Sequence, residues 1–277
     1  MQSRFLNFDF GKLHYLQGGK ANAPTIVFLH GTASTAASFA DLEPILGDQF
    51  NLIALDFPGH GLSDHIDVAR FGFQYSMIGL RTLFEEFRHR LSLHEIIAAG
   101  NSVGANIATQ SLFKDPNLLG LVSIAGVHAV SREDAFSNFR PEAPKELAFK
   151  NHLVGDEADA LTRAYLDVSQ AGTEVYKRML ADIKESDGNF REQFAIHLKT
   201  QGWLDELAIL SGSKVPFLYI GGKNDAFIDN AYYDKLQARV PRIQPANVHI
   251  LEDVGHVPHL EAPEVCGKLI LEFSKTL

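Results

Sequence analysis

The chain alternates short apolar runs with stretches of helical periodicity, and this alternation limits its fold more than any other feature. The apolar runs span 25–31, 51–59, 95–102, 118–126, 215–222 and 247–256. Each is continuous and contains or borders a glycine at its end, which is typical of strands buried on both faces. Helical periodicity covers 36–47, 75–91, 104–114, 229–239 and 262–275. This pattern predicts an α/β fold, with a mostly parallel central sheet flanked by helices.

Two segments depart from the alternation. Residues 3–17 alternate in strand fashion around Gly11-Lys12, which predicts a β-hairpin that turns at these two residues. From 131 to 210 no buried-strand run appears, and the spacing of apolar residues is helical. We therefore expect a core of residues 1–130 and 211–277 that carries a helical cap, or lid, at 131–210.

The predicted cap is rich in large aromatic side chains. We expect most of them to form the interior of a small helical layer, and a minority to line a substrate pocket. The aromatic residues concerned are Phe136, Phe139, Phe149, Phe190, Phe194 and Trp203.

Composition argues against several classes of function. The 277 residues are 45% hydrophobic and carry a formal net charge of -9. Nucleic acid is therefore not an expected partner, because phosphates require clustered Lys and Arg. No apolar run approaches the roughly 20 residues of a membrane span, and the first residues do not resemble a secretory signal. Because Cys266 is the one cysteine, no internal disulfide can form, and we expect a cytoplasmic protein.

One serine lies between two glycines where a predicted strand becomes a predicted helix. The stretch "GNSVG" (100–104) follows "EIIAA" and matches the G-x-S-x-G nucleophile elbow, in which a tight turn lifts the serine clear of the sheet. Gly100 and Gly104 would let the two backbones come close, and the helix would point free N–H groups at Ser102. We expect Ser102 to be a nucleophile, although a glycine-rich turn with an idle serine has the same pattern.

A serine nucleophile needs a base, and the base needs an acid that orients it. The elbow predicts the chain order serine, acid, histidine, with each partner just after a later strand. Asp225 follows the run 215–222, and His256 ends the run 247–256. Asp229 is the rival acid, but it precedes a helical stretch and suits a helix N-cap. We therefore predict Ser102, Asp225 and His256 as the catalytic residues.

Four blocks of the sequence together resemble the α/β-hydrolase superfamily over nearly the whole chain. They are "FLHGTASTAASF", the D-x-P-G-x-G-x-S block "LDFPGHGLSD", the elbow "GNSVGAN", and the pair "GGKNDAFI" and "GHVPHLEAPE". Their order is that of the family. The resemblance implies an α/β-hydrolase fold of the serine-nucleophile, esterase-like branch with a helical cap.

The resemblance also implies an oxyanion hole. Its donors would be the backbone N–H groups of Val103 and Thr32, and Val103 follows from the elbow geometry as well. His30 and His60, which precede glycines in loops, would hold loop backbone. No cofactor is implied. A metal is not expected either, because the histidine pair near the end of the chain has no adjacent ligand to complete a set.

These residues predict a serine hydrolase that cleaves the carboxylic ester of a small or medium apolar molecule through an acyl-enzyme. Alternatives stay open, as does the oligomeric state. Asn101, the residue before the serine, resembles the residue at that position in carbon–carbon bond (meta-cleavage product) hydrolases. Ala105, however, stands where these enzymes usually carry glycine. Acyl transfer to an alcohol or amine would need the same residues. The fold could also serve a ligand-binding signalling protein with little turnover.

Overall fold

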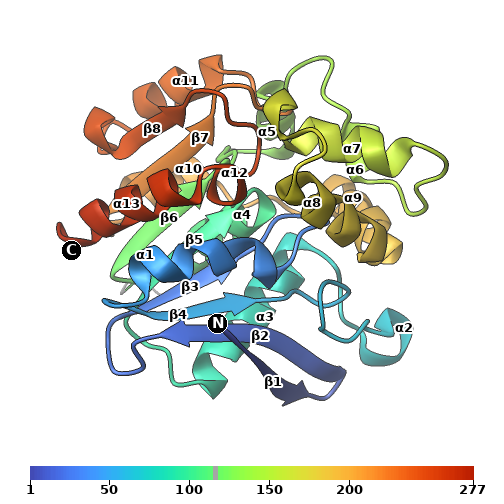
Figure 1. Ribbon diagram of the computed structural model, residues 1–277, viewed down its shortest axis with the longest axis horizontal. Coiled ribbons are helices and arrows are strands. Elements are labelled where there is room, and N and C mark those ends of the chain that lie inside the picture. The colour runs from blue at the N-terminus through green and yellow to red at the C-terminus, as the bar shows by residue number, and fades with distance from the viewer. Residues whose placement is uncertain (115–117) are drawn as a thin grey trace.

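The centre of the molecule is a mixed sheet. In residues 1–114 and 118–277, which the computed structural model describes, eight strands pair in the order β1-β2-β4-β3-β5-β6-β7-β8 (Figure 1). The pairs from β4 to β8 are parallel, whereas β2 is antiparallel to both neighbours. The strands are β1 (Gln2–Phe8), β2 (Gly11–Gly19), β3 (Thr25–Leu29), β4 (Asn51–Leu55), β5 (Ile96–Asn101), β6 (Gly120–Ile124), β7 (Phe217–Gly222) and β8 (Val248–Leu251). The predicted fold class is confirmed.

The first hairpin turns earlier than the sequence predicts. The two strands pair as far as Gly11, so Asp9 and Phe10 form the turn and Gly11 begins β2. Gly11 has a φ of 136°, and a Cβ there would lie 2.5 Å from the Asp64 carboxylate. That carboxylate also accepts the Lys12 N–H at 2.7 Å. Both this positive φ and the close approach of Asp64 favour glycine at the first residue of β2, so Gly11 does not mark the turn itself.

Alternating side chains of the central strands build two cores, one on each face of the sheet. In β3, Ile26 and Phe28 face one core, while Val27 and Leu29 face the other. The first core is closed by η1 (Ala36–Leu42), α1 (Glu43–Leu46) and α13 (Pro263–Ser274), and the second by α3 (Met77–Arg90), α4 (Val103–Ser111) and α11 (Ala231–Arg239). Short helices in the loops are α2 (Val68–Phe71), η3 (Pro245–Asn247) and α12 (Pro258–Glu261).

The connection between β6 and β7 is mainly helical. It contains α5 (Arg132–Ser137), α6 (Lys145–Ala148), α7 (Glu157–Tyr165), η2 (Val168–Gln170), α8 (Glu174–Glu185), α9 (Gly188–Thr200) and α10 (Glu206–Gly212). In Figure 1 most of these helices lie at the right, beyond the carboxyl ends of the central strands. Because α10 crosses residue 210 and packs against α4, the division into a cap of 131–210 and a core stays a prediction.

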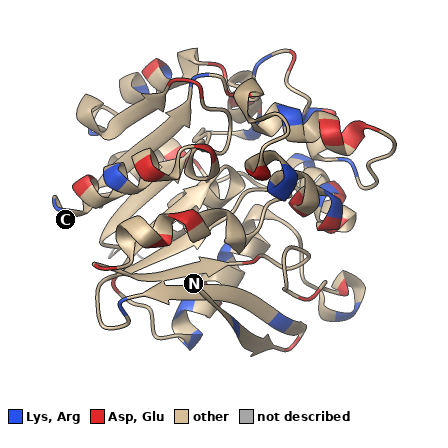
Figure 2. Cartoon of the chain, viewed as in Figure 1, with Lys and Arg blue, Asp and Glu red and all other residues tan. Residues whose placement is uncertain are grey.

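Charged side chains lie away from the central strands. Strands β3 to β7 contain no Asp, Glu, Lys or Arg, and Figure 2 shows these charges on the helices, the loops and the edge hairpin of β1 and β2. Among the described residues, no helix has both the length and the apolar character that a bilayer span requires. The cytoplasmic location stays a prediction.

Candidate active site

Ser102 lies at a tight turn between β5 and α4. Its φ of 52° and ψ of −120° form a conformation that residues other than glycine rarely adopt, and its N–H donates to the Ile124 carbonyl at 2.8 Å. A Cβ on Gly100 would lie 2.2 Å from the Gly104 carbonyl, and one on Gly104 would lie 2.1 Å from the Leu29 oxygen. Strand and helix backbones therefore nearly touch here, as in a nucleophile elbow.

The N-terminus of α4 and the loop after β3 meet beside the serine. A Cβ on Gly31 would lie 3.1 Å from the Ser102 Cβ, and Thr32 and Val103 border the same pocket as Ser102. Among the described residues, no protein acceptor takes the N–H of Val103 or of Thr32. Two free donors beside a serine can bind a developing oxyanion. Their assignment as the oxyanion hole stays a prediction.

His256 and Asp225 form a buried, hydrogen-bonded pair. The His256 Nδ1 lies 2.7 Å from the Asp225 Oδ2, and the exposed fractions of the two residues are 3% and 0%. The other carboxylate oxygen of Asp225 accepts the N–H groups of Phe227 and Ile228, at 2.7 and 3.0 Å. Because the carboxylate is held in one orientation, it can fix the tautomer and the ring plane of the imidazole.

Ser102 and His256 border one pocket, but among the described residues no hydrogen bond joins the serine hydroxyl to the imidazole. Such bonds are often long until substrate binds. The His256 backbone is nevertheless fixed, because its N–H donates to the Tyr165 carbonyl at 2.8 Å and its own carbonyl accepts from the Asn101 amide at 3.0 Å. The three predicted residues lie in one region, and their action as a triad stays a prediction.

Asp229, the rival acid, holds backbone. Its carboxylate accepts the N–H of Ala231, the first residue of α11, at 2.9 Å. Among the described residues no histidine pairs with it, whereas Asp225 contacts His256 directly. The geometry therefore favours Asp225 as the acid.

Glu261 holds the loop on which His256 lies. One carboxylate oxygen accepts the N–H groups of Gly255 and Val257, at 3.0 and 3.4 Å, and the other accepts the Asp167 N–H at 2.7 Å. Burial raises the pKa of Glu261 to about 7, although these three N–H groups lower it. This role of Glu261 was not predicted from the sequence.

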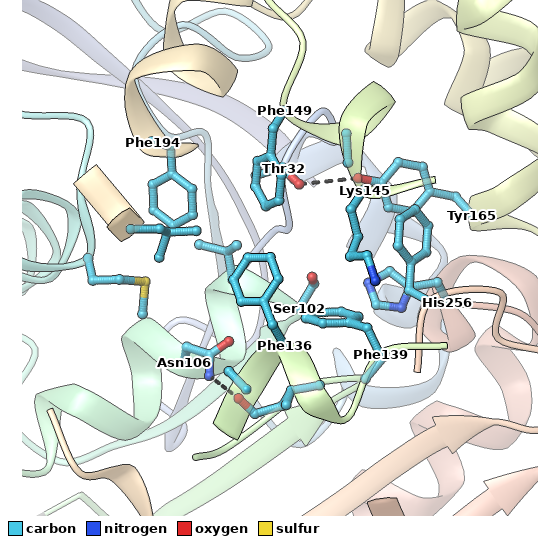
Figure 3. A pocket seen from close by; sticks show the side chains of 18 of the residues that line it. Thr32, Ser102, Asn106, Phe136, Phe139, Lys145, Phe149, Tyr165, Phe194 and His256 are labelled. Atoms are coloured by element: carbon cyan, nitrogen blue, oxygen red, sulfur yellow. Dashed lines mark hydrogen bonds between the residues drawn. The ribbon is translucent and has the colours of Figure 1, made fainter. Parts of the chain in front are cut away.

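The pocket beside Ser102 is small and lined mainly by apolar side chains, with a cavity volume of about 80 Å³. Its aromatic walls include Phe136, Phe139, Phe149, Phe194 and Trp203, several of which surround the Ser102 hydroxyl in Figure 3. Five of the six aromatic residues singled out in the sequence thus border the pocket, and the expectation that only a minority would do so is wrong. Side chains from the interior of the helical layer therefore also form the wall of the pocket. Phe190 is the exception and stacks on Phe194, with 5.7 Å between ring centroids.

Two further pocket residues come from the helical segment and were not predicted. Tyr165 ends α7, and its hydroxyl lies 3.2 Å from the Thr32 Oγ1, while its ring centroid is 5.6 Å from that of His256. Lys145 begins α6 and brings an ammonium group to the mainly apolar wall. Neither residue stands at a fixed spacing from a motif, so the sequence offers no signal for its position.

His30 and His60 support the loop that carries Thr32. The Phe57 N–H donates to the His30 Nε2 at 2.9 Å, and the Ala33 N–H donates to the His60 Nε2 at 3.2 Å. Burial lowers the pKa of both imidazoles, so both remain neutral acceptors at neutral pH. They hold loop backbone, as the resemblance implies.

His259 packs inside the protein. Its Nε2 lies 3.1 Å from the Ser38 Oγ, and its ring stacks on Phe39 with 4.2 Å between centroids. Burial lowers the pKa of His259 to about 3. Among the described residues, no three His, Cys, Asp or Glu side chains are grouped so as to hold a metal ion.

A second serine–histidine–acid array lies behind the pocket. The Ser123 Oγ is 2.8 Å from the His128 Nε2, and the His128 Nδ1 is 3.0 Å from the Glu206 Oε2. All three residues have an exposed fraction of 0%. The Asn106 amide, which borders the pocket, donates to the same Glu206 oxygen at 2.7 Å. This buried array joins β6 and α4 to α10, and no motif in the sequence indicated it.

Fold and site together define a hydrolase of the α/β type, and comparison with known proteins agrees. A model of the alpha/beta hydrolase family matches residues 26–268. The chain therefore belongs to the alpha/beta hydrolase family, as its sequence blocks predicted.

Relatives of this chain include hydrolases and an esterase. A 2-hydroxy-6-oxononadienedioate/2-hydroxy-6-oxononatrienedioate hydrolase of Pseudomonas putida is 25% identical, over 98% of this chain and 96% of its own. A pimeloyl-[acyl-carrier protein] methyl ester esterase of Nitrosomonas europaea is 26% identical, over 88% of this chain and 92% of its own. The N-acyl homoserine lactonase AidH shares the fold, with a TM-score of 0.85 at 22% identity over 99% of this chain and 96% of that one. The predicted enzyme class, a carboxylesterase-like hydrolase of this family, is confirmed.

Proposed function

We propose that the protein is a serine hydrolase that cleaves the carboxylic ester of a small or medium, mainly apolar molecule. The observation that carries this proposal is the position of Ser102, at an elbow, on the same apolar pocket as the hydrogen-bonded pair of His256 and Asp225. The small volume and aromatic walls of the pocket favour a short acyl or alcohol group over a bulky polar one. The helical segment 131–210 would act as the cap that supplies most of these walls.

The proposed reaction runs through an acyl-enzyme. The Ser102 oxygen attacks the ester carbonyl while the His256 Nε2 accepts the hydroxyl proton, and the N–H groups of Val103 and Thr32 bind the oxyanion. His256 then gives this proton to the leaving alcohol as the carbon–oxygen bond breaks. Water attacks the acyl-enzyme with His256 as base, and the acid leaves as the Ser102 hydroxyl is restored. Asp225 holds the imidazole throughout, and no cofactor takes part.

The test compares the two serines on short p-nitrophenyl esters. We expect Ser102→Ala to lower kcat by about 10³-fold or more, because no other group can form the acyl-enzyme. Ser123→Ala, in the buried array, is the matched control and should keep kcat within about threefold of wild type, since this serine has no access to substrate. Full activity of a folded Ser102→Ala protein would end the proposal.

Carbon–carbon bond hydrolysis is the second candidate. It is favoured by the dienedioate hydrolase of P. putida among the relatives and by Asn101, whose amide holds the His256 carbonyl. A kcat/KM for a 2-hydroxy-6-oxodienoate well above that of every ester on a panel would select this candidate.

The same assays distinguish two other roles from ester hydrolysis. Labelling of Ser102 by a fluorophosphonate without turnover of any ester would indicate a ligand-binding protein. Transfer of the acyl group to an added alcohol, in preference to water, would indicate an acyltransferase.

A further inference from the structure

Lys145 is a cation in an apolar wall. It begins α6, is half-buried, and borders the pocket together with Ser102 and His256. Its ammonium group donates to the Arg140 carbonyl at 3.3 Å. Among the described residues, no carboxylate forms an ion pair with it. In Figure 3 the side chain extends toward the end of the pocket at which Ser102 and His256 lie.

Other lysines of the helical segment are placed differently. The other four lysines of 131–210 are exposed, and two of them form ion pairs, Lys150 with Glu157 and Lys177 with Glu174, each at 2.6 Å. Lys145 is half-buried as a residue and its ammonium group has one carbonyl partner, so an anion beside it would add an ion pair that the described residues do not supply. The contrast indicates that Lys145 is placed to meet a ligand.

Lys145 also borders an outer groove between α5, α6 and α9, with a volume of about 770 Å³. The pocket and the groove share four wall residues, namely Phe136, Lys145, Phe149 and Leu198. Lys145 therefore stands where the small pocket meets the larger groove. A substrate longer than the pocket would pass this ammonium group.

The groove sets a limit on the charge of such a substrate. Glu133, Glu146 and Glu192 border it, against Arg132 and Lys199 in addition to Lys145. These three carboxylates balance the three cations, so the groove has no net positive charge that would attract a multiply charged group such as a phosphate dianion, whereas a single negative charge can pair with Lys145 at close range. A carboxylate fits this pattern best.

We propose that Lys145 binds a carboxylate of the substrate, so that the enzyme acts on esters that carry a second, free carboxyl group beside an apolar body. This inference rests on the proposed ester hydrolysis and names its substrate class. Lys145 acts on binding and specificity and takes no part in the chemical step.

The test uses two pairs of matched p-nitrophenyl or acetyl esters. In the first pair, the acyl group comes from a short dicarboxylic acid whose far carboxyl is either free or a primary amide. In the second pair, the same choice is made on the alcohol side. We expect the wild-type kcat/KM to favour the carboxylate at least tenfold in one of the two pairs, mostly through KM, because a hydrogen bond to a charged group has about that effect.

Three variants then test whether Lys145 causes the preference for the carboxylate. Lys145→Met should reduce the ratio of carboxylate to amide kcat/KM at least tenfold, and Lys145→Arg should retain most of it. Lys184→Met removes the same charge from an exposed position on α8 and should leave the ratio unchanged. A structural role of Lys145 would lower both kcat/KM values together and leave their ratio as it is.

Two outcomes overturn the inference without touching the proposed function. They are hydrolysis of both pairs with no preference for the carboxylate, and a preference that survives Lys145→Met. If no ester is hydrolysed, the proposed function fails, and calorimetry with the free dicarboxylic acid decides the inference alone. Binding that is at least tenfold weaker in Lys145→Met supports it, and equal binding or no binding in the wild type overturns it.

Discussion

The two serine–histidine–acid arrays of this protein have similar side chains and very different surroundings. Among the described residues, both hydrogen bonds of the buried array are formed, with 2.8 Å between Ser123 and His128. At the pocket only the histidine–acid bond is formed, at 2.7 Å. Yet it is Ser102 that borders a cavity, has a strained backbone and lies beside free N–H donors. We therefore expect catalysis at Ser102, whose surroundings offer space and oxyanion donors, and not at Ser123, although Ser123 has the more complete hydrogen bonding.

Packing explains why the buried array has no room for a reaction. Ser123 lies within β6, and a Cβ on Gly126 would be only 2.6 Å from its hydroxyl oxygen. A tetrahedral intermediate at Ser123 would need space that backbone fills. We infer that this array stabilises the packing of α10 against α4, whereas the array at the pocket (Ser102, His256 and Asp225) performs the proposed chemistry.

Removal of each histidine gives the largest expected contrast. His256→Ala should lower kcat on a short p-nitrophenyl ester by about 10⁴-fold or more, because Ser102 loses its base. His128→Ala should keep kcat within about tenfold but lower the free energy of unfolding by about 3 kcal/mol, because Glu206 loses a buried partner. Steady-state kinetics and urea unfolding measure the two effects. A folded His128 variant as inactive as the His256 variant would contradict the division of roles.

Replacement of each acid by its amide comes next. Asp225→Asn should lower kcat by about 10³- to 10⁴-fold, since an amide beside the His256 Nδ1 favours the wrong tautomer. Glu206→Gln should lower the free energy of unfolding by about 1–3 kcal/mol, because the amide cannot accept from His128, Asn106 and Gln110 on two oxygens. The same two assays apply. Equal losses of activity in the two variants would show that the buried array also takes part in turnover.

The pocket array could be predicted from the sequence because its signals are local. The glycine pattern around Ser102 lies within five residues, and Gly100 is required by a contact with Gly104, although Gly104 itself is required by Leu29 of a distant strand. Asp225 and His256 follow apolar runs that form parallel strands. The same alternation of runs predicted the sheet and its flanking helices. These features depend on neighbours along the chain more than on tertiary packing.

The remaining features depend on contacts between distant segments. Glu206 reaches His128 and Asn106 only when α10 packs on α4. Tyr165 reaches Thr32 only because the helical segment folds over the loop after β3. The hairpin turn was misplaced for a similar reason, since Asp64 lies far from Gly11 in the sequence. No spacing rule within one segment carries this information.

Removal of a tyrosine hydroxyl beside each array should give a smaller contrast between activity and stability. Tyr165→Phe loses the hydrogen bond to the Thr32 Oγ1, and because Thr32 lies beside the proposed oxyanion site we expect kcat/KM to fall about fivefold. Tyr232→Phe is the counterpart, since its hydroxyl accepts the His128 N–H at 2.7 Å. It should lower the free energy of unfolding by about 1–2 kcal/mol and leave kcat/KM within about twofold. The opposite assignment of the two effects would refute the comparison.

The smallest expected effect is a change in the pH dependence of stability, which arises from Glu261, the residue that holds the loop that carries His256. Burial raises the pKa of Glu261 from its usual 4.5 to about 7, so between these values the folded protein holds a proton that the unfolded chain has released. Stability from this group is therefore full below the lower value and is lost as pH rises through the upper one. Glu261→Gln removes this titration.

The difference in Tm between about pH 5 and about pH 8 should consequently be smaller in Glu261→Gln than in the wild type. Glu272→Gln, at an exposed position of α13, serves as the control and should retain the wild-type difference. An unchanged pH dependence in Glu261→Gln would mean that this carboxyl does not titrate in the folded protein. The N–H groups of Gly255 and Val257 would then be held by a carboxylate that stays ionised. The loop that carries His256 would be as insensitive to pH as its hydrogen bonds to the Tyr165 carbonyl and the Asn101 amide.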